Sequence, residues 1–165
     1  ADDASISWVT TGELPGRGWY EIYKMKMDIW TPVDTVLAKG NLDNNQYSVG
    51  VDHYSGENLF KIAYHYEHTL TESEEFSFYS DLEPISYFPE DNIYDLITLS
   101  RVTDYIIKDH NGNVLLEGYG RDIVVSTLPY GELIMILENN EEYIFRPEPE
   151  PIDRPKKKKK RGTGY

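Results

Sequence analysis

The stretch Trp19–Met27 reads WYEIYKMKM, and the character of its side chains alternates from one residue to the next. Successive side chains of an extended strand point to opposite faces of a sheet. One face would therefore carry Trp19, Glu21, Tyr23, Met25 and Met27, and the other Tyr20, Ile22, Lys24 and Lys26. This period of two predicts a β-strand, because a helix would need a period near 3.6.

The same alternation recurs along the chain, in windows rich in Tyr, Ile, Val and Trp and bounded by Gly, Pro, Asn and Asp. The first series of predicted strands comprises Ser5–Val9, Trp19–Met27, Thr35–Ala38, Tyr47–Val51, Leu59–His65 and Glu75–Tyr79. The second series comprises Ile93–Leu99, Asp104–Lys108, Val114–Glu117, Asp122–Val125, Glu132–Leu137 and Tyr143–Arg146. Pro84 and Pro89 mark the break between the two series.

Asn111 and Gly112 give the strongest local turn signal, because both residue types tolerate the positive φ of a tight hairpin. We predict an all-β chain made of two small tandem β-sandwich domains, residues 1–83 and residues 84–147. Residues 148–165 are predicted to form an extended arm. Prolines alternate with acidic residues at its start, which favours polyproline II structure, and a lysine run follows.

The formal net charge of −13 is an average over two dissimilar parts of the 165-residue chain. Seven of the 16 basic residues lie after Asp153 and all 29 acidic residues lie at or before it, which leaves −20 for residues 1–153 and +7 for the last twelve. The absence of cysteine excludes disulfides, thiolate nucleophiles and zinc-thiolate sites. No apolar run approaches the roughly 18 residues of a membrane helix.

No catalytic or metal-binding pattern stands out. The chain has no phosphate-binding glycine loop, nucleophile elbow or metalloprotease motif. His65 and His68 would point to opposite faces of a strand, and the acidic clusters near Glu74 and Glu141 are interpreted as solvated turns. We therefore predict no enzyme activity, no catalytic residue, no metal site and no cofactor.

Two segments of the first series carry a resemblance to a known family. ISWVTTGE at residues 6–13 and WYEIYK at residues 19–24 resemble the B and C strands of a fibronectin type III-like domain. The version that they resemble precedes the sorting domain in proteins exported by the type IX secretion system. The order of the segments ending with Val36–Gly40, Tyr47–Val49 and Asn58–Ile62 agrees with that family over about 75 residues.

The second series resembles the C-terminal sorting domain of the same secretion system, a small β sandwich. The similar segments are Tyr105–Gly118 and Ile123–Leu133, which include the turn sequence STLPYG at residues 126–131. The resemblance implies a secreted, periplasmic or bacterial cell-surface protein. A fibronectin-like domain has a strand A before the strand that holds Trp8, yet only about four residues precede that strand here. Either the chain is a fragment or the domain is open at one edge, where a partner strand can pair.

The predicted function is non-catalytic binding to protein partners in a secreted or cell-surface assembly linked to type IX secretion. The alternative is a carbohydrate-binding accessory module of a secreted hydrolase, with exposed aromatic rings as its platform. The arm is expected to contact an acidic partner or an anionic surface, while nucleic acid is not expected as a partner. The candidate binding residues are Trp19, Trp30, Tyr54, Lys156, Lys157, Lys158, Lys159, Lys160 and Arg161.

Overall fold

The computed structural model describes residues 4–151, and within this range the chain forms strands and no helix. The all-β prediction is therefore confirmed. A helix long and apolar enough to cross a membrane is likewise absent from residues 4–151. The strands are β1 (Ala4–Thr10), β2 (Trp19–Lys26), β3 (Ile29–Leu37), β4 (Asn45–Val51), β5 (Gly56–Tyr66), β6 (Thr69–Glu72), β7 (Phe76–Ser80), β8 (Tyr87–Phe88), β9 (Leu96–Lys108), β10 (Val114–Val124), β11 (Leu133–Leu137) and β12 (Glu142–Phe145).

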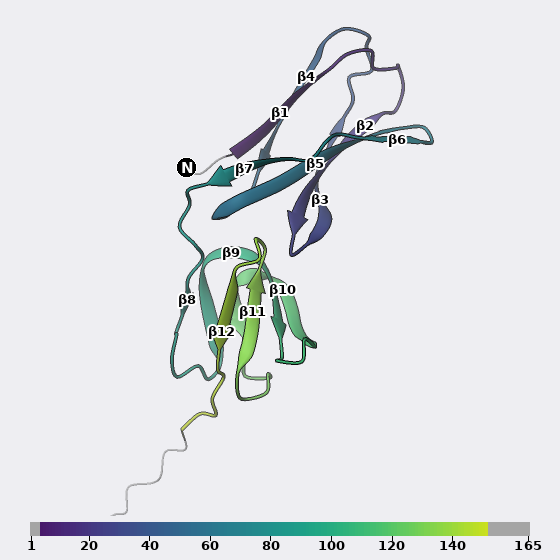
Figure 1. Ribbon diagram of the computed structural model, residues 1–165. Coiled ribbons are helices and arrows are strands. Elements are labelled where there is room, and N and C mark those ends of the chain that lie inside the picture. Colours follow the sequence, from purple (N-terminus) through teal and green to yellow (C-terminus); the bar gives the residue numbers. More distant parts are fainter. Residues whose placement is uncertain (1–3, 152–165) are drawn as a thin grey trace, which may run out of the picture.

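Strands β1 to β7 form the N-terminal half, residues 4–80, which has two layers (Figure 1). One layer is a two-stranded antiparallel pair, β1 and β4. The other is a sheet of order β3-β2-β5-β6, in which β7 pairs with the first part of β5. The predicted alternation in β2 holds, because Tyr20, Ile22 and Lys24 are buried while Trp19 and Glu21 lie on the outer face.

Strands β8 to β12 form the C-terminal half, a single sheet of order β10-β9-β11-β12 with β8 beside the start of β9. Residues Ile97, Leu99, Thr103, Tyr105 and Ile107 of the thirteen-residue strand β9 are all at most 9% exposed. The same face of β9 therefore points inward along its whole length. The pairing with β10 shifts register between Gly120 and Asp122, and such a bulge bends a sheet.

The predicted strand bounds were wrong at several places, mainly where β-bulges or edge strands occur. Ile93–Leu99 and Asp104–Lys108 were predicted as two strands. Strand β9 instead runs without a break from Leu96 to Lys108, because the residues between the two predicted strands lie in the bulge where its pairing with β10 shifts register. The same holds for β10, which joins two predicted strands. Strand β3 begins at Ile29 rather than at Thr35, since an edge strand tolerates Pro32. The short strands β6 and β8 were missed.

The hairpin predicted at Asn111-Gly112 is confirmed. Gly112 has a φ of 84°, and the Asp109 carboxylate accepts hydrogen bonds from the backbone N–H groups of Asn111 and Asn113. The prediction of an arm from residue 148 was wrong at its first residue. Glu148 N donates to Ile93 O at 2.8 Å, and the preceding Pro147 is buried and bridges to Ile93. Residues 152–165 lie outside the described range.

The buried side chains form two hydrophobic clusters. The cluster of the N-terminal half lies between its two layers and contains Ile6, Tyr20, Ile22, Tyr47, Val49, Phe60 and Ile62. The cluster of the C-terminal half has twice as many buried members, fourteen against seven. One of its members is Tyr54, from the segment between β4 and β5. The two halves are therefore joined by packing as well as by the connecting chain.

Candidate functional site

The outer face of the five-stranded sheet carries two of the three aromatic residues that the sequence singled out. Trp19 of β2 stacks on His65 of β5, with ring centroids 4.8 Å apart and planes 5° apart. Trp30 of β3 lies next to Met25 in the pairing register, and Lys61 Nζ lies 5.1 Å from the centre of its ring. Both tryptophans are half-buried, so each leaves part of its ring surface open to solvent.

Charged groups lie between these rings. The Glu21 carboxylate contacts His65 Nε2 at 3.0 Å and accepts a hydrogen bond from the Tyr23 hydroxyl. This hydrogen bond, more than burial, raises the pKa of Tyr23 to about 12. Lys61 lies over the Tyr23 ring and pairs with Glu72 at 2.9 Å. The face therefore combines flat apolar surface with oriented hydrogen-bonding groups, which are the elements of a sugar-binding or protein-binding surface.

Tyr54 does not belong to this face, and its prediction as an exposed binding residue was wrong. Its side chain is 5% exposed and packs in the hydrophobic cluster of the C-terminal half. Its hydroxyl donates to Val102 O at 3.0 Å, and Lys24 Nζ lies 4.7 Å from the centre of its ring. Tyr54 therefore links the N-terminal half to the C-terminal half. The basic candidates Lys156 to Arg161 lie outside the described residues.

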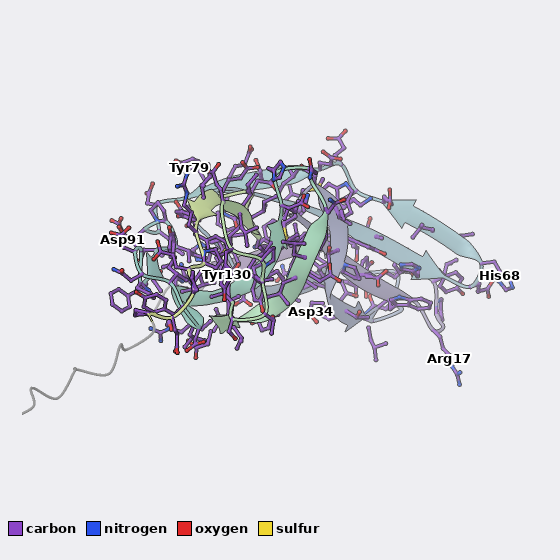
Figure 2. The ribbon with its side chains drawn as sticks, turned by 90° about the horizontal axis from the view of Figure 1, so that it is seen from below. Arg17, Asp34, His68, Tyr79, Asp91 and Tyr130 are labelled. Carbon is purple, nitrogen blue, oxygen red and sulfur yellow. The ribbon has the colours of Figure 1, made fainter. Side chains whose placement is uncertain are left out.

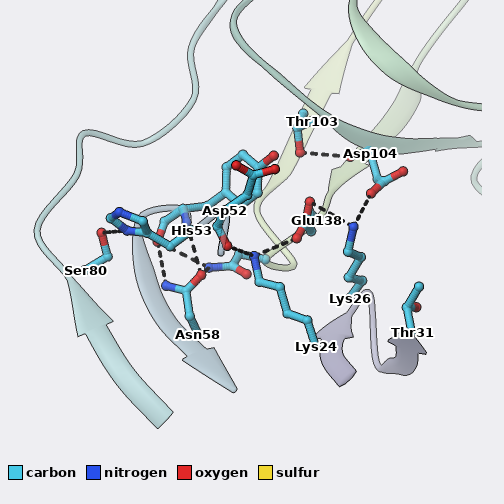
Figure 3. Close-up of polar contacts among 12 residues, drawn as sticks. Lys24, Lys26, Thr31, Asp52, His53, Asn58, Ser80, Thr103, Asp104 and Glu138 are labelled. Atoms are coloured by element: carbon cyan, nitrogen blue, oxygen red, sulfur yellow. Dashed lines mark hydrogen bonds and ion pairs between the residues drawn. The ribbon is translucent and has the colours of Figure 1, made fainter. Parts of the chain in front are cut away.

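A buried ion pair joins the two halves next to Tyr54 (Figure 3). Lys24 Nζ of β2 lies 2.6 Å from Glu138 Oε1, at the end of β11, and both side chains are 2% exposed. Lys24 Nζ also donates to Asp52 O at 3.0 Å. Burial lowers the pKa of Lys24, and the Glu138 carboxylate partly offsets this effect. The charges are therefore neutralised inside the protein rather than offered to a ligand.

A second, half-buried pair extends this junction. Lys26 Nζ lies 2.9 Å from Asp104 Oδ2 and 3.7 Å from Glu138 Oε2. Burial alone would lower the pKa of Lys26, but these two carboxylates raise it. The pairs form part of the wall of a cavity of about 560 Å³, whose other walls include Pro32, Val33, Asp34, Val51 and Tyr119. Figure 2 shows Asp34 between the end of the molecule that holds Arg17 and His68 and the end that holds Asp91.

Further hydrogen bonds complete the junction. Met27 N, in the turn between β2 and β3, donates to Glu138 O at 3.0 Å. Asn139 Nδ2 donates to Ser55 O at 3.0 Å, and Asn140 Nδ2 donates to Asp28 Oδ1 at the same distance. The β2–β3 and β11–β12 turns thus contact each other directly, which fixes the relative orientation of the two halves.

The sequence interpretation missed this junction. Glu138 belongs to the acidic cluster near Glu141 that was interpreted as a solvated turn, and this interpretation was wrong for Glu138 because the other half of the protein covers it. A signal was present in the β2 alternation, which places Lys24 and Lys26 on the face that also carries Tyr20 and Ile22. A lysine on an apolar face needs a buried acidic partner. The identity of that partner, 114 residues away, was not in the pattern.

The edge of β1 is the other feature that stands out. Within residues 4–151, β1 pairs only with β4, so about half of its backbone N–H and C=O groups point away from any neighbouring strand. Its sequence, ASISWVT, has no charge and no proline, and its pairing with β4 has no register shift. Proteins normally protect an exposed edge strand with charged side chains, prolines or bulges, and β1 has none of these.

The other edge strands are protected or short. Strand β3 contains Pro32 and a register shift, and β10 contains two register shifts. Strand β4 is as long and as uncharged as β1, but the charged Lys39 Nζ donates to Gln46 O of this strand at 2.9 Å. Strands β6, β7, β8 and β12 have at most five residues. Strand β1 therefore presents the longest unprotected edge of the described residues.

The described residues contain no group of three or more His, Asp or Glu side chains that could hold a metal ion. His65 stacks on Trp19, whereas His68 is exposed in the β5–β6 turn. No protein-family model matches the chain, and no curated protein matches it either.

Proposed function

We propose that the chain is a non-catalytic binding module of a secreted or cell-envelope assembly linked to type IX secretion. In this proposal a fibronectin-like sandwich is followed by a sorting-domain-like sandwich and a basic arm. The proposal rests on the sequence resemblance, on the all-β architecture and above all on the unprotected edge of β1. An added strand at such an edge gains main-chain hydrogen bonds without rearrangement of the protein.

The order of the strands is compatible with this proposal. If β1 corresponds to strand B of the resembled domain, the vacant side of β1 is the position of its strand A. A protein partner that supplies an extended segment would then complete the layer. The buried Lys24–Glu138 pair holds the C-terminal half in a fixed orientation to this edge, so a partner can contact both.

The edge can be tested with a lysine substitution, because a charged side chain on an edge strand disfavours strand addition. Val9 on β1 and Val124 on β10 are 60% and 57% exposed, so Val124→Lys is a matched control for Val9→Lys. Each variant of the 165-residue chain is immobilised and exposed to solubilised envelope proteins of the source cells. We expect the same protein to be retained by the wild type and Val124→Lys and lost by Val9→Lys. Equal retention by all three would contradict the proposal.

A second candidate function is binding of carbohydrate, as an accessory module of a secreted hydrolase. The observation that favours it is the outer face with Trp19, Tyr23 and Trp30, where the charged groups of Glu21 and Lys61 lie beside the rings. A glycan array distinguishes this function. Binding that is lost in Trp30→Ala and kept in Tyr130→Ala, a variant of an exposed aromatic in the C-terminal half, would support it.

A further inference from the structure

The layer that contains β1 is too narrow to cover the sheet beneath it. Phe76 and Phe78 of β7 pair with Phe60 and Asn58 of β5, and side chains of directly paired residues share a face of the sheet. Phe60 and Asn58 are both 0% exposed, so this is the inward face. Phe76 and Phe78 nevertheless remain half-buried. Two inward-facing phenylalanines thus lack a full cover.

The vacant side of β1 lies over these phenylalanines. Strand β4 lies above the β3 side of the lower sheet, because Lys39, just after β3, donates from its backbone N to the Tyr47 hydroxyl at 2.8 Å. In the lower sheet β3 and β7 lie on opposite sides of β2 and β5. The free edge of β1 is therefore directed to the β7 side. One more strand beside β1 would cover Phe76 and Phe78.

The charges around this position define the chemistry of the strand that fits it. Glu74 and Glu75 precede β7, and Asp81 and Glu83 follow it. All four are exposed, and none forms an ion pair among the described residues. A strand with basic ends would place positive charge beside these carboxylates at both ends of β7.

We propose that the free edge of β1 binds an extended segment of a partner protein, about seven residues long, with an apolar residue at every second position and Lys or Arg at both ends. The apolar residues face Phe76 and Phe78, and the basic residues face the four carboxylates. This inference rests on the proposed function, since it specifies the partner of the same edge. A second copy of the chain fits less well, because Asp2 and Asp3 would accompany its β1 strand.

The test uses the 165-residue chain and fluorescent synthetic peptides in titrations followed by anisotropy. The reference peptide is Lys-Val-Ser-Ile-Thr-Val-Ser-Val-Lys, and the two controls carry Glu at both ends or the same residues in an order without alternation. We expect the reference to bind at least about tenfold more tightly than either control. Its affinity should fall as salt is raised, because exposed charges are screened.

Two protein variants separate this inference from the proposed function. Val9→Lys should abolish binding of every peptide, with Val124→Lys as the control that binds normally. Changing Glu74, Glu75, Asp81 and Glu83 together to their amides should weaken the reference peptide by about tenfold, since each exposed ion pair contributes little on its own. Binding that needs the β1 edge but shows no preference between Lys and Glu ends would overturn the inference and leave the proposed function standing.

Other occupants give distinct results. Dimerisation of the free protein in sedimentation that Val9→Lys abolishes would identify a second copy as the occupant and overturn the inference. Tighter binding of a peptide with the sequence of residues 154–165 than of the reference would identify the arm of the chain instead. Peptide binding unaffected by Val9→Lys would overturn both the inference and the edge as a site.

Discussion

The two halves of the molecule cover their hydrophobic cores in different ways. The sheet of the C-terminal half keeps one face inward through the bend of β9, and its core is covered by that sheet, its loops and Tyr54 of the other half. The N-terminal half has two separate layers of unequal width, and its core remains open beside β1. Continuity of one sheet closes a core, whereas a narrow covering layer leaves both an edge and apolar surface available for a partner.

The largest expected effect concerns the pair that joins the halves. Removing one member of a buried ion pair leaves an uncompensated charge, so Glu138→Ala should lower the free energy of unfolding by about 3–5 kcal/mol. Urea unfolding followed by circular dichroism measures this loss.

The matched control for Glu138→Ala is the more exposed Lys61–Glu72 pair. Glu72→Ala should cost less than about 1 kcal/mol. The double variant Lys24→Met/Glu138→Leu should recover most of the loss, because an apolar pair needs no desolvation of charge. A Glu138→Ala variant as stable as the wild type would show that the pair does not couple the halves.

The next effect compares the enclosed core with the open one. Phe145 in the C-terminal half is 2% exposed, so Phe145→Ala should cost about 3–5 kcal/mol. Phe78 in the N-terminal half is only half-buried, and Phe78→Ala should cost about 1–2 kcal/mol because less apolar area is lost. Urea unfolding of each variant measures the loss in the free energy of unfolding. Equal costs would mean that the core beside β7 is as well covered as the other, which would remove the basis of the strand vacancy.

Sequence alone predicted the all-β class, the alternation of β2 and the Asn111-Gly112 hairpin, because each of these depends on neighbouring residues. It did not predict the bend of β9, where long-range pairing overrides a polar stretch that looks like a loop. The face of Trp19 followed from the local alternation, whereas that of Trp30 did not, because the strand that holds it was predicted to begin only at Thr35. The burial of Tyr54 and Glu138 did not, since contact between the halves covers both.

A smaller effect concerns two carboxylates whose pKa values shift in opposite directions. Burial would raise the pKa of Glu13 in the N-terminal half, but hydrogen bonds from Thr10, Tyr47, Gly40 and Tyr20 lower it. Burial raises the pKa of Glu141 in the C-terminal half. Stabilisation by Glu13 is therefore complete above the pKa of about 4.3 that glutamate has when unfolded, and it is lost as the pH falls through its folded value. The ionised Glu141 carboxylate instead lowers the stability of the folded protein at neutral pH, and its protonation at low pH removes this destabilisation.

Tryptophan fluorescence can isolate the Glu13 contribution, because all three tryptophans lie in the N-terminal half. At pH 7, Glu13→Gln should lower the free energy of unfolding by about 1.5–3 kcal/mol through the loss of charge-assisted hydrogen bonds. The difference from the wild type should shrink below pH 4. Glu141→Gln should instead stabilise the protein at pH 7 and have little effect at pH 3. A constant Glu13→Gln difference from pH 7 to pH 3 would contradict the lowered pKa.

The smallest effect compares two hairpin turns. The β9–β10 turn has Gly112 at a φ of 84°, whereas the β5–β6 turn has Glu67 at a φ of 50°. A side chain in this left-handed region costs about 1–2 kcal/mol relative to glycine. Gly112→Ala should therefore destabilise the C-terminal half by about 1 kcal/mol. Glu67→Gly should stabilise the N-terminal half by up to about 1 kcal/mol, reduced by the greater freedom of glycine in the unfolded chain. Thermal unfolding resolves such shifts, and destabilisation by Glu67→Gly would show that the exposed side chain of Glu67 contributes more than its backbone costs.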